Sequence, residues 1–223
     1  MSSRDAILGR VRRALADVRQ DDTPYDEAID RSYLREHGDR SVEETVDLLA
    51  ENLADYRALV HRCTEEELPE VLMRLLAERG ATSVLVPPEL PPSWLKAVDA
   101  TRVHDRAAST PHELDRVDSA VTGCAVAIAE TGSIVLDGSP DQGRRRITLV
   151  PDHHICVVRV PGQVVSSVPQ GLERLDPARP LTWISGPSAT SDIELDRVEG
   201  VHGPRTLEVV LVGGRPPEAE VTS

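Results

Sequence analysis

The sequence predicts an α/β domain in which a mixed, partly parallel sheet is flanked by helices, with a helical appendage at the amino terminus. Two observations carry this prediction. Residues 41–86 alternate helical and strand patterns, as chains do when crossover helices connect parallel strands. From residue 125 onward, short apolar runs are joined by loops mostly too short for crossover helices, which indicates some antiparallel pairing.

The expected helices follow from apolar spacing and from start signals. Residues 3–18 place apolar side chains at helical spacing with arginines on other faces, which is typical of an amphipathic helix. Capping-box patterns at 41–44 and 64–67 each begin a further helix, and the second of these helices ends at Gly80. Residues 20–40 are polar and show no sustained period, so we expect a connector there.

Strands are expected where β-branched and apolar residues run together. The first is residues 82–86, which two prolines close. The later apolar runs, each expected to form a strand, are 125–129, 133–136, 147–150, 155–160, 181–185 and 207–212. Between the fourth and fifth of these runs, residues 168–175 allow a short helix.

These elements divide the chain into three parts. We expect an N-terminal helix and connector over residues 1–40, an α/β domain over residues 41–213, and a flexible tail over residues 214–223.

Charge and composition restrict the class of function. The 38 acidic residues outnumber the 25 Lys and Arg, and the net charge of −13 opposes a polyanion, so we expect no nucleic-acid partner. No window approaches the ~20 apolar residues of a membrane span, and the start of the chain lacks the apolar stretch of a signal peptide. We therefore expect a cytoplasmic protein with no membrane span.

The three cysteines are too widely separated for a disulfide framework, a zinc site or an iron–sulfur motif. We therefore expect no metal and no cofactor bound by this chain alone.

A loop rich in Gly, Ser and Thr follows the run at 181–185. Free backbone N–H groups and hydroxyls in such a loop attract anions. Helix capping is the alternative role for the same side chains, and a carboxylate in a first helical turn can itself occupy the positive helix end. The ligand-binding candidates in this loop are Gly186, Ser188, Thr190, Asp192 and Glu194.

A second polar loop precedes the last strand. His202, Gly203 and Arg205 lie there beside Pro204, and an arginine on so fixed a backbone can clamp a carboxylate or a phosphate. The alternative is an internal ion pair from Arg205 to Asp192 or Glu194, and both roles can hold at once.

Glu130 is the catalytic candidate. It lies between two apolar runs, where a partly desolvated carboxylate can act as an acid, a base or a nucleophile, with Thr131 and Gly132 as neighbouring ligand-binding candidates. The alternative is a turn glutamate that is solvated or bonded to the backbone.

Two further patterns receive structural interpretations. The basic triplet at 144–146 is interpreted as a solvated loop. His153 and His154 open a strand, where adjacent side chains point to opposite faces, so they cannot chelate one metal and at most one imidazole faces a site.

Four segments in a fixed order, AETGSIVL, PDHHICVV, WISGPSATSDIEL and EGVHGPRTLEVVLV, resemble the LUD domain family of lactate utilisation protein C. The resemblance extends over about residues 118–213, and the ILGRVRRAL helix and the strand at 82–86 are similar too. It implies a fold similar to the phosphosugar isomerase and CoA-transferase group, and a role with two iron–sulfur partner proteins in oxidising L-lactate to pyruvate. Because this chain has no cluster motif, the resemblance places the iron–sulfur clusters in the partner subunits.

Three hypotheses of function remain. In the first, the chain is a non-cluster subunit or accessory protein of an iron–sulfur L-lactate oxidation system and binds a small carboxylate or phosphorylated metabolite in its C-terminal loops. In the second, it is an independent enzyme that acts on a phosphosugar or a CoA ester through Glu130. In the third, it is a non-catalytic metabolite sensor or scaffold.

Overall fold

The computed structural model describes residues 2–17, 24, 27, 29–30, 32–190, 198–199 and 203–213. The chain forms two compact units, residues 1–34 and residues 35–223. Residues 35–40, which the sequence predicts as connector, therefore belong to the larger unit.

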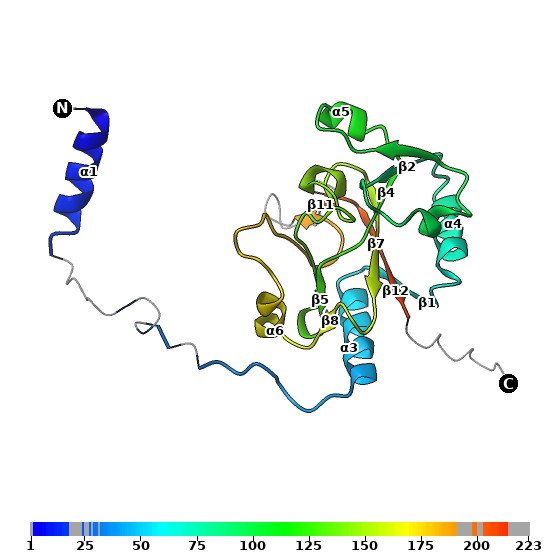
Figure 1. The fold of residues 1–223 in the computed structure, drawn as a ribbon, viewed down its shortest axis with the longest axis horizontal. Coiled ribbons are helices and arrows are strands. Elements are labelled where there is room, and N and C mark those ends of the chain that lie inside the picture. The colour runs from blue at the N-terminus through cyan, green and yellow to red at the C-terminus, as the bar shows by residue number, and fades with distance from the viewer. Residues whose placement is uncertain are drawn as a thin grey trace. The chain divides into compact units, whose positions relative to one another are not determined.

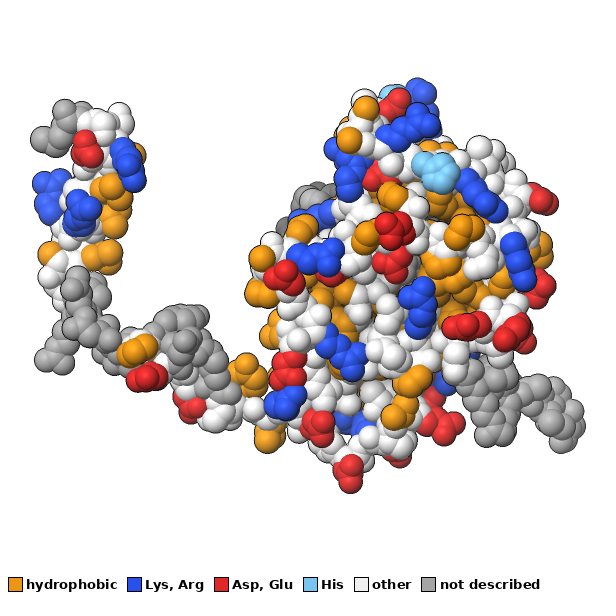
Figure 2. Space-filling view, in the orientation of Figure 1, with side chains coloured by type: hydrophobic (Ala, Val, Ile, Leu, Met, Phe, Trp, Pro, Cys, Tyr) orange, Lys and Arg blue, Asp and Glu red, His pale blue; other side chains and the backbone are white. Residues whose placement is uncertain are grey.

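The first unit contains the helix α1 (Ser3–Ala14), which begins at a capping box formed by Ser2 and Asp5. This confirms the helix that apolar spacing predicts over residues 3–18. None of its residues is buried, and Ile7, Val11 and Leu15 are exposed along it. Figure 2 shows hydrophobic and basic side chains at the surface of this helix.

The second unit is built on a six-stranded sheet in which every pair is parallel, in the order β1-β12-β7-β4-β2-β3. Its strands are β1 (Leu59–Cys63), β2 (Ser83–Val86), β3 (Thr101–His104), β4 (Ser119–Thr122), β7 (His153–Arg159) and β12 (Thr206–Val212).

A second sheet has four strands in the order β8-β5-β6-β9 and contains antiparallel pairs. Its strands are β5 (Val126–Ile128), β6 (Ser133–Leu136), β8 (Val164–Val165) and β9 (Thr182–Ile184), and a separate two-stranded ribbon pairs β10 (Ala189–Thr190) with β11 (Val198–Glu199).

The helices of this unit are α3 (Val42–Asp55), α4 (Leu68–Glu78), α5 (Pro111–Leu114) and α6 (Val168–Glu173). The described part of this unit also contains the 3-10 helices η1 (Pro92–Leu95), η2 (Ala129–Thr131) and η3 (Arg145–Thr148).

The mixed α/β class is confirmed, and the strands divide between a fully parallel six-stranded sheet and a smaller mixed sheet, in which β5 pairs with β8 in parallel and β6 pairs with β5 and β9 in antiparallel. Strands β1, β3 and β4 lie outside the predicted runs, because they are short and interrupted by polar residues such as His61 and Arg62. The strand predicted at 147–150 is wrong: this run overlaps η3, whose Ile147 and Thr148 are buried. An apolar run of four residues fits a buried strand and a buried helical turn equally well.

The two faces of the six-stranded sheet carry different layers. Leu49 of α3 and Ile134 of β6 share a core cluster with Val209 on one face. Leu72 of α4 and Trp94 of η1 share a second cluster on the other face. Figure 1 shows α3 and the small sheet on one side of β7 and β12, and α4 on the other.

The starts of β7 and β12 lie next to each other, since Thr206 pairs with His153 in the parallel register. The loop that leaves β9 reaches this point, where the Ser188 backbone N–H donates to the Pro204 carbonyl at 2.8 Å. Helix η3 ends just before β7 in the chain. Segments that are distant in sequence therefore meet at the amino ends of two central strands.

Candidate functional site

A cavity of about 500 Å³ lies where these segments meet. We call it the Arg145 pocket. It is lined by η3, by His154 at the start of β7, by β9 and the loop that follows it, and by the residues that lead into β12.

Arg145 is the basic group of this pocket. Its side chain has no hydrogen-bond or ion-pair partner among the residues that the structure describes, and the residue is exposed. Its two neighbours are occupied: the Arg144 guanidinium makes a two-pronged contact with Asp105, and Arg146 donates to the Ser109 carbonyl. The triplet is therefore not a uniformly solvated loop: within the described part of the chain, Arg144 and Arg146 have partners, whereas Arg145 lines the pocket without one.

His154 contributes a buried polar group to the same pocket. Its Nε2 lies 2.8 Å from the Thr122 hydroxyl oxygen. Burial, and to a smaller extent the neighbouring His153, lowers the pKa of His154 to about 3. The imidazole is therefore neutral near pH 7 and takes part through hydrogen bonding.

His153 has a separate set of partners, as the alternation of side chains along a strand predicts. Its Nδ1 lies 2.8 Å from the Ser119 hydroxyl, and its Nε2 lies 3.3 Å from Glu208. His61 Nε2 contacts the same carboxylate at 2.6 Å. Burial acts to raise the pKa of Glu208, but its contacts with His153 and His61 outweigh that effect and lower the pKa to about 2.

The two motif glycines pack against α3 and its end. Gly186 has φ +79°, and a Cβ on it would lie 2.2 Å from the Tyr56 carbonyl oxygen. Gly132 has φ +53°, and a Cβ on it would lie 2.7 Å from the Asn52 carbonyl carbon. Both positions therefore require the absence of a side chain, and they fix the loops that follow β5 and β9 against one helix.

The predicted ligand-binding residues fall into separate groups. Gly186, Ser188 and Gly203 line the Arg145 pocket together. Arg205 is exposed and lies 3.6 Å from Asp152, and it is not part of the pocket lining. Thr190 belongs to β10, with its side chain outside the described residues.

Asp192, Glu194 and His202 lie outside the residues that the structure describes.

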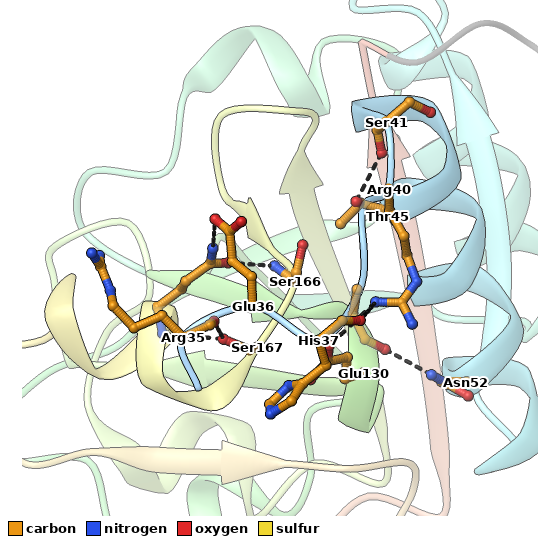
Figure 3. A network of polar contacts seen from close by, with 12 residues as sticks. Arg35, Glu36, His37, Arg40, Ser41, Thr45, Asn52, Glu130, Ser166 and Ser167 are labelled. Atoms are coloured by element: carbon orange, nitrogen blue, oxygen red, sulfur yellow. Dashed lines mark hydrogen bonds and ion pairs between the residues drawn. The ribbon is translucent and has the colours of Figure 1, made fainter. Parts of the chain in front are cut away.

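Glu130 lies in η2, away from the pocket lining. Its carboxylate contacts His37 Nδ1 at 2.9 Å and Arg40 Nη1 at 3.2 Å, as Figure 3 shows. Beside it, the Asn52 amide donates to the Ala129 carbonyl at 2.7 Å. The contacts of Glu130 hold the segment of residues 35–40 against the turn that contains η2.

Thr131 and Gly132 accompany Glu130 at this turn and are likewise outside the lining of the Arg145 pocket. The Thr131 hydroxyl is buried and has no hydrogen-bond partner among the described residues. The turn is joined to the β9 loop by the Ser133 and Ser185 hydroxyl oxygens, which lie 2.7 Å apart.

The sequence did not identify Arg145, Thr148, His154 or Trp183 as pocket residues. The basic triplet in an acidic chain was the available signal for Arg145. Nothing in the sequence distinguishes Arg145 from Arg144 and Arg146, because their partners come from a segment almost forty residues earlier.

Among the described residues, no group of three His, Cys, Asp or Glu side chains is arranged to hold a metal ion. No helix in the described part of the chain combines the length and the apolar character that crossing a membrane requires.

The chain is similar to proteins that carry a lactate utilisation name. It is 48% identical to a lactate utilization protein C of Deinococcus radiodurans, over 73% of this chain and 77% of that protein. It is 31% identical to a lactate utilization protein C of Geobacillus kaustophilus, over 68% of this chain and 71% of that protein.

A crystal structure of a DUF162 family protein from Deinococcus radiodurans matches the fold with a TM-score of 0.67 and 40% identity, over 78% of this chain and all of that chain. The family model of the LUD domain matches residues 46–212, which include both sheets and the Arg145 pocket. The chain belongs to the LUD domain family.

Proposed function

We propose that this protein is a component of a lactate utilisation system and that it binds an organic anion in the Arg145 pocket. Membership of the LUD domain family and the names of its relatives support the first part. The second part rests on the Arg145 guanidinium, which lies at the wall of a cavity and has no partner among the residues that the structure describes.

The pocket suits an anion for electrostatic reasons. A guanidinium forms strong, directional hydrogen bonds with a carboxylate or a phosphate. Ser188 and Thr148 contribute hydroxyl groups to the same lining. His154 contributes an imidazole ring that is neutral near pH 7. An anion bound here meets one positive charge in a protein whose overall charge is −13.

In this proposal, the oxidation of L-lactate to pyruvate is carried out with iron–sulfur partner subunits. The sequence of this chain has no cluster motif, so the electron carriers belong to those partners. This protein then contributes ligand binding or organisation of the complex in the cytoplasm.

Growth of a deletion strain tests the role in lactate utilisation. We expect loss of growth on L-lactate with growth on glucose retained, and restoration by the wild-type gene. Co-purification of a tagged chain with iron–sulfur proteins is expected in lactate-grown cells. Normal growth of the deletion strain on L-lactate contradicts the proposal.

Thermal unfolding tests the anion site directly. L-lactate, pyruvate, inorganic phosphate and ribose 5-phosphate are added to the purified chain, and at least one is expected to raise the Tm by preferential binding to the folded state. Arg145→Gln is expected to abolish the increase, and Arg205→Gln serves as the matched control because Arg205 is exposed and paired with Asp152. An increase that Arg145→Gln leaves unchanged contradicts this site.

The hypothesis of an independent phosphosugar or CoA-ester enzyme remains a prediction that turnover assays can decide. Turnover by the isolated chain that Glu130→Gln abolishes would replace the proposal above. A sensor or scaffold instead predicts ligand-dependent stabilisation without turnover, and normal lactate oxidation by the partner subunits alone.

A further inference from the structure

The volume of the Arg145 pocket is informative about its ligand. Pockets of ~300–1,000 Å³ enclose drug-sized molecules, and this one measures about 500 Å³. Lactate and pyruvate are much smaller and would leave most of this space to water. A ligand that fills the pocket must therefore carry a larger group in addition to its anionic group.

A second cavity of about 190 Å³ adjoins the first, since Arg145, Thr148 and Thr182 line both. The guanidinium therefore lies between a large and a small space. This arrangement places an anionic group of the ligand at Arg145, with the body of the ligand in the larger space.

One part of the wall of the larger space is apolar and contains an exposed indole. Trp183 is 41% exposed, and Leu149, Leu181 and Pro187 line the same pocket. Trp183 lies on β9, an edge strand of the small sheet. An exposed indole beside a cavity is suited to stacking on a planar ring.

The other tryptophan shows the contrast. Trp94 is buried in the core on the α4 face of the sheet, and its ring lies 5.0 Å from the Arg159 guanidinium carbon. Its position is explained by packing, whereas Trp183 lines the pocket and is 41% exposed.

We propose that the Arg145 pocket binds a phosphorylated compound with a planar ring, of the size of a mononucleotide. The phosphate lies at Arg145 beside the Thr182 hydroxyl, and the ring stacks on Trp183. The buried His154 provides a neutral hydrogen-bonding group at the wall. This inference rests on the proposed anion site and adds the class of ligand.

Calorimetric titration of the full chain tests the ligand class. The probes are AMP, UMP and FMN as ring-bearing phosphates, ribose 5-phosphate and inorganic phosphate as ringless phosphates, and L-lactate. Because stacking of one base on an aromatic side chain strengthens binding substantially, at least one mononucleotide is expected to bind about tenfold more tightly than ribose 5-phosphate.

Two variants separate the contributions of ring and phosphate. Trp183→Leu is expected to reduce mononucleotide affinity to that of ribose 5-phosphate while leaving ribose 5-phosphate binding unchanged, and Trp183→Phe is expected to restore most of the difference. Arg145→Gln is expected to lower the affinity for every phosphate probe about tenfold or more, whereas Arg205→Gln is expected to leave all affinities unchanged. Circular dichroism of each variant confirms that it is folded.

The outcomes distinguish this inference from the proposed function. If ribose 5-phosphate or L-lactate binds as tightly as every mononucleotide, and Arg145→Gln abolishes that binding, the ligand class is wrong and the anion site stands. If none of the probes binds, or if binding depends on Arg205 and not on Arg145, both the ligand class and the anion site are wrong. The growth experiment on L-lactate remains independent of either result.

Discussion

Arg144, Arg145 and Arg146 are consecutive residues of one chemical type with three different environments. Two of the guanidinium groups hold η3 and the residue before it to the segment that precedes α5. The middle one turns to the pocket without a partner in the described part of the chain. Residue type predicts the charge at such positions, while the partners that are within reach decide whether the charge is available to a ligand.

His154 makes the stability of the protein depend on pH. Its pKa is about 3 in the folded protein, against 6.5 for an ordinary histidine. Below pH 6.5 the unfolded chain takes up a proton that the folded chain excludes, so this residue's contribution to the free energy of unfolding decreases by up to about 1.4 kcal/mol per pH unit between pH 6.5 and 3.

We therefore expect His154→Gln to show a shallower loss of stability than the wild type over this pH range, measured by urea unfolding at several pH values. His104→Gln, at an exposed position on β3, is the matched control and should follow the wild-type profile. Equal slopes for wild type and His154→Gln would show that His154 is protonated in the folded state.

At the scale of elements, α3 and its end support two loops of the small sheet, the one that follows β5 and the one that follows β9. Gly132 and Gly186 each approach the backbone of this helix or its end too closely for a side chain. Leu49 and Leu53 on the same helix are fully buried in the core that joins the two sheets. The helix is therefore a shared support for the turn at η2 and for the wall of the Arg145 pocket.

Gly132→Ala is expected to destabilise the protein by about 3 kcal/mol, because the new methyl group collides with the Asn52 backbone and the backbone is left-handed. Gly80→Ala is the matched control: Gly80 has φ +63° with nothing within 4 Å of its Cβ position, so only backbone strain of about 1 kcal/mol is expected. Chemical denaturation measures both. Equal losses would mean that α3 moves to accommodate the methyl group.

The segment of residues 35–40 is held against the rest of the larger unit by side-chain contacts. Besides the contacts of Glu130 with His37 and Arg40, the Ser167 hydroxyl donates to the Arg35 carbonyl. Glu130→Gln removes the carboxylate that contacts His37 and Arg40, so we expect cleavage by trypsin after Arg40 to become about fivefold faster, as a loss of roughly 1 kcal/mol implies. Asp152→Asn, which removes an exposed ion pair elsewhere, should leave the rate unchanged. Unchanged cleavage in Glu130→Gln would show that Glu130 does not hold this segment.

At the scale of the whole molecule, the larger unit has its own cores on both faces of the six-stranded sheet, whereas α1 buries none of its residues. We therefore expect a variant that lacks residues 1–34 to unfold cooperatively with a Tm within about 2 °C of the full chain, because the surface buried on folding is nearly the same. Differential scanning calorimetry measures this. A decrease of many degrees would show that residues 1–34 stabilise the larger unit.

Much of the architecture follows from local patterns. Capping boxes, apolar spacing and short β-branched runs predict α1, α3, α4, β2 and the strands β5, β6 and β9 of the small sheet, because these signals depend only on neighbouring residues. The family resemblance is likewise contained in four local motifs, and it is confirmed by the LUD domain match. The similarity to phosphosugar isomerases and CoA transferases remains a prediction.

The sequence by itself determined the α/β class, most of the elements, the family and the opposite facing of His153 and His154. Only the tertiary structure decided that the strands divide between a fully parallel sheet and a small mixed sheet, that Glu130 is paired with His37 and Arg40, and that Arg145 rather than Arg205 lines the pocket. The physical reason is that helix starts and side-chain alternation are local properties of the backbone. The partner of a charge or the wall of a cavity is instead set by contacts between segments far apart in the chain.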